Sequence, residues 1–286
     1  MIIGLILAFA SAAGTNLAFL FKQRGAVLAP PIDVRHLLRS AVGLFRSRWF
    51  LIGWIVAIVA WGLHVGALSL APLSIVQAVL SGGLVFLAVF AERFFGFQLG
   101  RRQWVGVTIT AAGLAVIGLT GGGANDPQRA SLAALIAVEG AIFAIGAALV
   151  RVSTRRHVLP RAEGLLLGAA AGALFGVSDV AIKWLTQAAP GPLLGLVSPW
   201  TMTAIIAGVI SFYASARSLQ IGEGVEVIAL TSVAANLAAI IGGILVFHEP
   251  IGSGPLGISA RFIAFCLVIA GAALMPAPMR ARPERT

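Results

Sequence analysis

Residues 49–70 read WFLIGWIVAIVAWGLHVGALSL, an apolar run whose one ionisable residue is His64. About 20 apolar residues are enough to cross roughly 30 Å of hydrocarbon as an α-helix. The run does not alternate with a period of two, as the strands of a membrane barrel do, so a helix is the structure that satisfies its backbone groups in lipid. The stretch therefore predicts a transmembrane helix.

Similar runs recur along the whole chain on both sides of this stretch. The chain is 59% hydrophobic and 10% charged, whereas a soluble domain needs about a quarter of its residues charged. The sequence therefore predicts an all-α membrane protein with nine transmembrane helices. The predicted spans are 2–21, 49–70, 73–91, 104–121, 132–150, 164–185, 199–217, 225–247 and 257–276.

The positions of the basic residues predict the orientation of these spans. Cytoplasmic loops are enriched in Lys and Arg. With the N-terminus outside and the C-terminus inside, 17 of the 20 Lys and Arg residues lie on the inner side. The outer side and its helix ends keep Arg129, Lys183 and Arg261. A cleaved signal peptide is the alternative for the first span, but its first cation, Lys22, follows the apolar run rather than preceding it.

The one sizeable loop, residues 22–48, lies on the predicted inner side. It contains Pro30-Pro31 and then DVRHLLRSAVGLFRSRW, in which apolar residues alternate with Arg35, Arg39 and Arg46. This pattern is typical of a short basic amphipathic helix on a membrane surface. A plain solvated basic loop remains an equal alternative for this segment.

Two parts of the chain resemble each other and divide it into an inverted repeat. LILAFASAAGTNLAFLFK (5–22) aligns with LLGAAAGALFGVSDVAIK (166–183), which pairs Lys22 with Lys183, and Gly113 aligns with Gly271. The first four helices thus repeat as the last four, with the fifth between them, so the second copy enters the membrane the other way up. Inverted repeats are a transporter architecture. The expected parts are the first repeat 1–121, a connecting segment 122–163, the second repeat 164–276 and a basic cytoplasmic tail 277–286.

One long stretch resembles a known transporter superfamily. It is GALSLAPLSIVQAVLSGGLVFLAVFAERFFGFQLGRRQWVGVTITAAGLAVIGL, from Gly66 to Leu119. Each half is similar to the four-helix unit of the small multidrug resistance proteins, and the whole resembles the EamA-like drug/metabolite transporter superfamily. The nine spans, the basic first loop and WGLHVGALSLAPLS look most like the NIPA-type magnesium transporters. Two departures are that the first helix has Asn16 where the multidrug proteins carry a coupling glutamate, and that Gly96-Phe97 stands where the superfamily commonly has Gly-Glu.

Ionisable residues inside the spans are the candidate pathway residues, because each costs at least a few kcal/mol in lipid and by default faces an interior path. Glu139 lies near the middle of span 132–150 and is the first candidate for binding a proton or cation. Asp179 and Lys183 are four residues apart, so they share one helix face and can pair. Lys183 can also extend to the outer interface.

Four further polar residues complete the candidate set. Asn236 lies near the middle of span 225–247. Gln77 and Glu226 occupy matching positions in the repeat, where they would belong to gates at opposite faces, although Glu226 could equally be a solvated helix start. His64 could relay protons, but a packed, hydrogen-bonded histidine is the better interpretation.

These features predict a secondary transporter that moves a small metabolite or cationic drug-like solute by alternating access. A magnesium-type divalent-cation permease and a lipid or lipid-linked sugar translocator are the alternatives. No catalytic cluster, metal site, nucleotide-binding loop or cofactor motif is evident, so we expect neither an enzyme nor an ATP-driven pump. The expected partners are the lipid bilayer and a solute or ion, not nucleic acid, and a homodimer stays open. The excess of arginine over lysine favours a bacterial inner or plasma membrane.

Overall fold

The computed structural model describes residues 2–32, 36–97, 99–120, 130–155, 158–188, 198–249 and 254–274. These residues form helices and no strands. The helices are α1 (Ile2–Val27), α2 (Leu37–Phe45), α3 (Arg48–Leu70), α4 (Leu73–Phe94), α5 (Arg101–Thr120), α6 (Leu132–Ser153), α7 (Pro160–Ala188), α8 (Pro199–Ile221), α9 (Gly224–Phe247) and α10 (Gly254–Leu274). Residues 121–129, at the start of the predicted connecting segment, and the predicted tail 277–286 lie outside the described residues.

Seven of the described helices are long and apolar enough to cross a membrane, namely α1, α3, α4, α6, α7, α8 and α9. Large apolar side chains cover their outer surfaces, and Ile55, Ile136 and Leu245 are each more than half exposed. Such a surface suits contact with lipid, whereas a soluble monomer rarely exposes contiguous apolar patches of this kind. The chain is therefore a multi-pass helical membrane protein. Helices α5 and α10 coincide with two further predicted spans, and the count of nine crossings stays a prediction.

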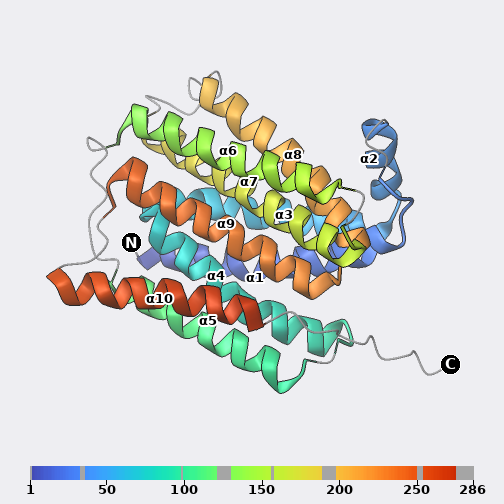
Figure 1. Ribbon diagram of the computed structural model, residues 1–286, viewed down its shortest axis with the longest axis horizontal. Helices are drawn as coiled ribbons and strands as arrows, with labels where there is room; N and C mark the ends of the chain where they lie inside the picture. The colour runs from blue at the N-terminus through green and yellow to red at the C-terminus, as the bar shows by residue number, and fades with distance from the viewer. Residues whose placement is uncertain are drawn as a thin grey trace.

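The helices pack in two sets with the same internal order (Figure 1). In one set α1 packs against α3 and α4, and in the other α7 packs against α8 and α9. Helix α4 also packs against α9, which joins the two sets, while α6 lies on α7 and α9. Helices α5 and α10 pack side by side along one edge of the bundle (Figure 1).

Glycines bring neighbouring helices into close contact at two of these crossings. A Cβ atom on Gly172 of α7 would clash with the backbone carbonyl of Thr231 in α9. A Cβ atom on Gly113 of α5 would lie 2.8 Å from the carbonyl oxygen of Ala264 in α10. Small residues allow this approach where lipid supplies no hydrophobic force between helices. Gly168 and Gly176 of α7 approach α9 in the same way, so these glycines serve close helix packing.

The loop between α1 and α3 contains the short helix that its amphipathic pattern predicts. In α2, Leu38 and Val42 face outward, while Leu44 is buried. Phe45 at its end stacks on Phe212 of α8 with 6.3 Å between ring centroids, and the Tyr213 hydroxyl donates to the Leu37 carbonyl at 3.2 Å. Helix α2 therefore contacts the second set of helices at one end of the bundle (Figure 1). Its place on a membrane leaflet stays a prediction.

Candidate functional site

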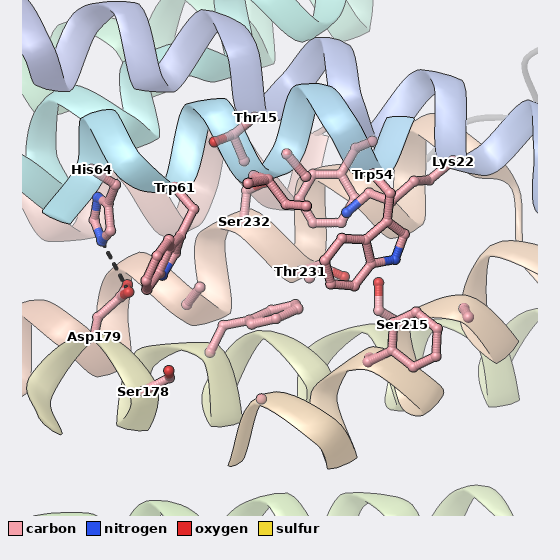
Figure 2. Close-up of a pocket in the computed structure, with 18 of the residues that line it drawn as sticks. Thr15, Lys22, Trp54, Trp61, His64, Ser178, Asp179, Ser215, Thr231 and Ser232 are labelled. Carbon is pink, nitrogen blue, oxygen red and sulfur yellow. Dashed lines mark hydrogen bonds and ion pairs between the residues drawn. The ribbon is translucent and has the colours of Figure 1, made fainter. Parts of the chain in front are cut away.

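A cavity of about 860 Å³ lies between the two sets of helices. Its walls come from α1, α3, α4, α7, α8 and α9, with Phe45 of α2 at one end. This volume lies within the range of about 300–1,000 Å³ that is usual for small-molecule sites. Most of the wall is apolar or aromatic. Figure 2 shows the hydroxyl-bearing and charged side chains that lie among these residues.

Asp179 of α7 is the centre of a polar cluster at one end of this cavity. Its Oδ1 lies 2.9 Å from Nε2 of His64 in α3, and its Oδ2 accepts a hydrogen bond of 2.8 Å from Nε2 of Gln77 in α4. Since an ionised carboxylate can only accept, the proton in the His64 contact belongs on Nε2. A single carboxylate thus links α7 to two helices of the other set, and both of its oxygens are engaged.

The opposite end of the cavity carries a cation among aromatic rings. Figure 2 shows Lys22 of α1 and Trp54 of α3 at this end, far from the dashed contact between His64 and Asp179. The Lys22 ammonium lies 4.2 Å from the centroid of the Phe19 ring. Trp54 and Phe212 pack with 6.0 Å between ring centroids. The cavity therefore has one cationic, aromatic end and one end built around a carboxylate.

Two amides line the wall between these ends. Asn16 of α1 is buried and donates through Nδ2 to the carbonyl of Ala12 at 2.8 Å, and its Oδ1 has no hydrogen-bond partner among the described residues. Asn236 of α9 is also buried in the cavity wall. Together with the hydroxyl groups of lining residues such as Thr15, Thr231 and Ser232, these amides offer polar contacts to a bound solute.

The structure brings four of the seven predicted pathway residues to the same cavity. They are His64, Gln77, Asp179 and Asn236. The expectation of a packed, hydrogen-bonded His64 is correct. The other three, Glu139, Lys183 and Glu226, do not line the cavity.

Lys183 corrects the expected pairing with Asp179. Its Nζ donates to the carbonyls of Leu68 at 2.6 Å and Ala71 at 2.8 Å, at the end of α3, and the side chain is buried rather than extended to an interface. The last carbonyls of a helix lack intrahelical partners, so they attract a buried ammonium group. Asp179 is occupied instead by His64 and Gln77.

Glu226 is not a solvated helix start. It is buried at the beginning of α9 and forms an ion pair with Arg161 at the beginning of α7, with 3.1 Å between Oε2 and Nη2. The pair joins two helices of the same set. The proposed gating role of Glu226 stays a prediction, and the structure gives it a partner within its own set.

Glu139 lies in α6, on the face that packs toward α7 and α9. It is buried, and its Oε1 has no hydrogen-bond partner among the described residues. A buried carboxylate oxygen without a partner is costly. Glu139 therefore remains a candidate for ion coupling, at a place separate from the cavity wall.

The sequence interpretation missed Lys22 and the aromatic end of the cavity. It ended the first span at residue 21 and placed Lys22 in the inner loop, but α1 continues to Val27. The signal was present as a helical stripe on α1, because the residues at this spacing all line the cavity: Ala12, Thr15, Asn16, Phe19 and Lys22. Continuing that stripe by one turn would have included Lys22.

The architecture and the cavity together define a class, a multi-pass helical membrane protein with an internal site of solute size. No group of three or more His, Cys, Asp or Glu side chains that could hold a metal ion occurs in the described part of the chain.

Comparison with known proteins agrees with this class. Over 282 residues the chain is 24% identical to the probable magnesium transporter NIPA9 of Arabidopsis thaliana, covering 94% of this chain and 80% of that protein. The similarity thus covers nearly the whole of this chain and four fifths of a plant protein named as a probable transporter. No protein-family model and no solved structure matches the chain.

Proposed function

We propose that the protein is a secondary transporter that moves a small organic solute across the membrane by alternating access. The observation that carries the proposal is the cavity of about 860 Å³ between two helix sets that pack in the same internal order. A volume of this size, lined by apolar and aromatic side chains with few polar groups, is the usual form of a site for an organic molecule.

The proposal also includes the number of membrane crossings, the repeat and the superfamily. It comprises nine crossings with the N-terminus outside, the four-helix repeats 1–121 and 164–276, and the drug/metabolite transporter superfamily. Helix α1 packs on α3 and α4, and α7 packs on α8 and α9. These corresponding contacts support the repeat. In an inverted repeat the site lies between the halves, and rocking one half on the other exposes it to each side in turn.

Asp179 supplies a means of coupling solute binding to this movement. Its contacts to His64 and Gln77 connect α7 to α3 and α4. They therefore stabilise the relative position of the two helix sets in this conformation. A solute or ion that binds an oxygen of Asp179 would compete with His64 or Gln77 for the charge of the carboxylate. Binding would then weaken the link between the two sets, which is the differential interaction that a ligand-driven change requires.

A magnesium permease is the second candidate, favoured by the similarity to a probable magnesium transporter. Mg²⁺ keeps several water molecules and is commonly bound through one or two carboxylates. In the cavity wall Asp179 is the one carboxylate among the described lining residues. The further oxygen atoms are neutral and belong to the amides of Gln77, Asn16 and Asn236 and to the hydroxyl groups of Thr15, Ser178, Ser215, Thr231 and Ser232. A single carboxylate in a cavity that also contains the Lys22 cation is a weak set of ligands for Mg²⁺, and we therefore place the organic solute first.

Uptake into proteoliposomes separates the two candidates. We would measure a panel of labelled organic solutes and, in parallel, Mg²⁺ with a dye inside the vesicles, each with and without a pH gradient. Saturable uptake of an organic solute that Mg²⁺ does not compete with is the expected result. Saturable Mg²⁺ uptake without any solute uptake would contradict the first proposal and favour the second.

A pair of glycine variants tests whether the cavity is the pathway. Gly208 lines the cavity, and Gly140 lies exposed on α6 outside it; a Cβ atom at either position meets nothing within 4 Å. Gly208→Phe should place a ring in the cavity and lower uptake strongly, while Gly140→Phe should leave uptake unchanged. Normal uptake by a folded Gly208→Phe protein would place the pathway elsewhere.

A further inference from the structure

The charge of Lys22 has no counter-ion in the described part of the chain. Its Nζ forms no hydrogen bond or ion pair there, and its contact is with the face of the Phe19 ring. Gly53 of α3 confines its stem, because a Cβ atom at Gly53 would lie 2.8 Å from Cγ of Lys22. The ammonium group is thus held in the cavity wall rather than extended away from it.

The lysine that the sequence repeat pairs with it has a different environment. Lys183 donates to two backbone carbonyls and is almost wholly buried outside the cavity wall. Lys22 lies in the cavity wall and has no such acceptors. The Lys183 ammonium therefore has hydrogen-bond acceptors in the protein, whereas the Lys22 ammonium lies in the cavity wall, where a bound solute can contact it.

A second donor without an acceptor lies beside Lys22. The Nε1–H group of Trp54 is buried and has no hydrogen-bond partner among the described residues. Trp54 follows Gly53 directly, so its indole and the Lys22 stem meet at the same turn of α3. Buried donors without partners are uncommon, and each calls for an explanation.

The other charged side chains near the cavity do not neutralise the positive charge of Lys22. Asp179 lies at the other end, with one oxygen on His64 and the other on Gln77. Glu139 does not line the cavity. A cation in surroundings of low dielectric attracts an anion strongly and opposes a second cation. The aromatic rings of Phe50, Trp54 and Phe212 beside it suit a flat apolar body.

We propose that Lys22 and Trp54 form an anion subsite, and that the transported solute is an organic anion whose flat apolar body packs on the adjacent aromatic rings. The anionic group, a carboxylate or a phosphate, accepts from the Lys22 ammonium and the Trp54 indole N–H. This assignment rests on the proposed function, because it takes the cavity as the solute site. It narrows that proposal to one charge class and disfavours cationic solutes and free Mg²⁺ in this cavity.

Probes with similar rings and different charges test the subsite by equilibrium binding to the full-length protein in lipid nanodiscs. Indole-3-acetate carries a carboxylate, phenyl phosphate a phosphate, and tryptamine an ammonium group on the same indole ring. Wild-type protein should bind the anions more tightly than tryptamine. Comparing phenyl phosphate with benzoate, a carboxylate on the same phenyl ring, shows which of the two anionic groups the subsite prefers.

Three variants identify the residues responsible. Lys22→Gln should weaken anion binding by about tenfold to a hundredfold, the value of one charge-assisted hydrogen bond, without weakening tryptamine binding. Lys22→Arg should retain most of the affinity, and Trp54→Phe should lose about fivefold. Arg24→Gln is the matched control, since Arg24 is exposed, stacks on Trp49 at 4.2 Å and does not line the cavity.

The outcomes separate the subsite from the transport proposal. Equal or tighter binding of tryptamine, unchanged anion affinity in Lys22→Gln, or no binding of any of the anions to folded wild-type protein would overturn the subsite. Uptake of solutes without regard to their charge would leave transport intact and remove the subsite alone. Anion binding that depends on Lys22, in a protein that takes up no solute, would support the subsite and overturn transport.

Discussion

Replacing Asp179 with Asn tests the polar link between the two helix sets. The side chains of Asp179 and His64 are 16% and 7% exposed, so solvent screens their contact little. A hydrogen bond to an ionised group contributes about 1.5–3 kcal/mol, and a neutral one about 1 kcal/mol. Asn keeps the shape of Asp, so even if both contacts to His64 and Gln77 survive, each loses about 1 kcal/mol.

The expected total is therefore about 2 kcal/mol, which corresponds to a shift of about thirtyfold in the equilibrium between linked and separated helix sets. We would measure initial uptake rates in proteoliposomes and, in parallel, thermal unfolding followed by size-exclusion chromatography. Glu92→Gln removes the same charge at the exposed end of α4 and should change neither measurement. His64→Gln combined with Asp179→Asn should give less than the sum of the single effects, because the two residues share one contact.

The reasoning would be refuted if folded Asp179→Asn protein matched wild type in uptake rate and unfolding temperature. Additive effects in the double variant would likewise show that His64 and Asp179 act independently. The first result would remove the whole link between α3, α4 and α7 from transport, and the second would remove the contact between His64 and Asp179 from it.

Three further predictions concern coupling, packing and topology. Glu139→Gln keeps the shape of the side chain and removes its charge, and should abolish gradient-driven uptake without loss of folded protein; uptake with an unchanged response to the pH gradient would contradict this. Gly172→Val should lower stability by about 1–3 kcal/mol through overpacking against Thr231, whereas Gly62→Ala, whose Cβ atom meets nothing within 4 Å, should have little effect on the unfolding temperature. Single cysteines near residues 40 and 158, in a Cys266→Ser background, should react with an impermeant reagent from the cytoplasmic side, and one at residue 1 from outside; labelling of 40 and 158 from opposite sides would overturn the predicted topology.

The apolar runs were sufficient to predict the helices, because lipid leaves the backbone few other structures. Predicted span 225–247 and α9 (Gly224–Phe247) differ by one residue at the start. Errors arose at helix ends, where polar residues continue the helix beyond the apolar run, as Lys22 does in α1.

The contacts of the site were less predictable from the sequence. Asp179 and Lys183 are neighbours on one helix face, yet their partners come from α3 and α4, more than a hundred residues earlier in the chain. Local spacing shows which side chains share a face and does not show which distant helix packs against that face. Polar residues within the spans were a correct signal for four residues of the cavity wall: His64, Gln77, Asp179 and Asn236. The hydrogen bonds of Asp179 to His64 and Gln77 could not be predicted in this way.

The contacts around residues 68–73, where α3 passes into α4, have a mechanical consequence. The Lys183 ammonium holds the carbonyls of Leu68 and Ala71, and Oε1 of Glu249, just beyond α9, accepts from the backbone N–H of Leu73 at 2.6 Å. The second helix set thus binds the turn between α3 and α4 through the ammonium group of Lys183 and the carboxylate of Glu249. We expect this turn to act as a hinge. A small tilt of α3 about the turn would then move the opposite end of α3 over a larger distance. That far end lies beside α2, so in the proposed transport cycle the widest movement would occur at the end of the cavity that Phe45 lines.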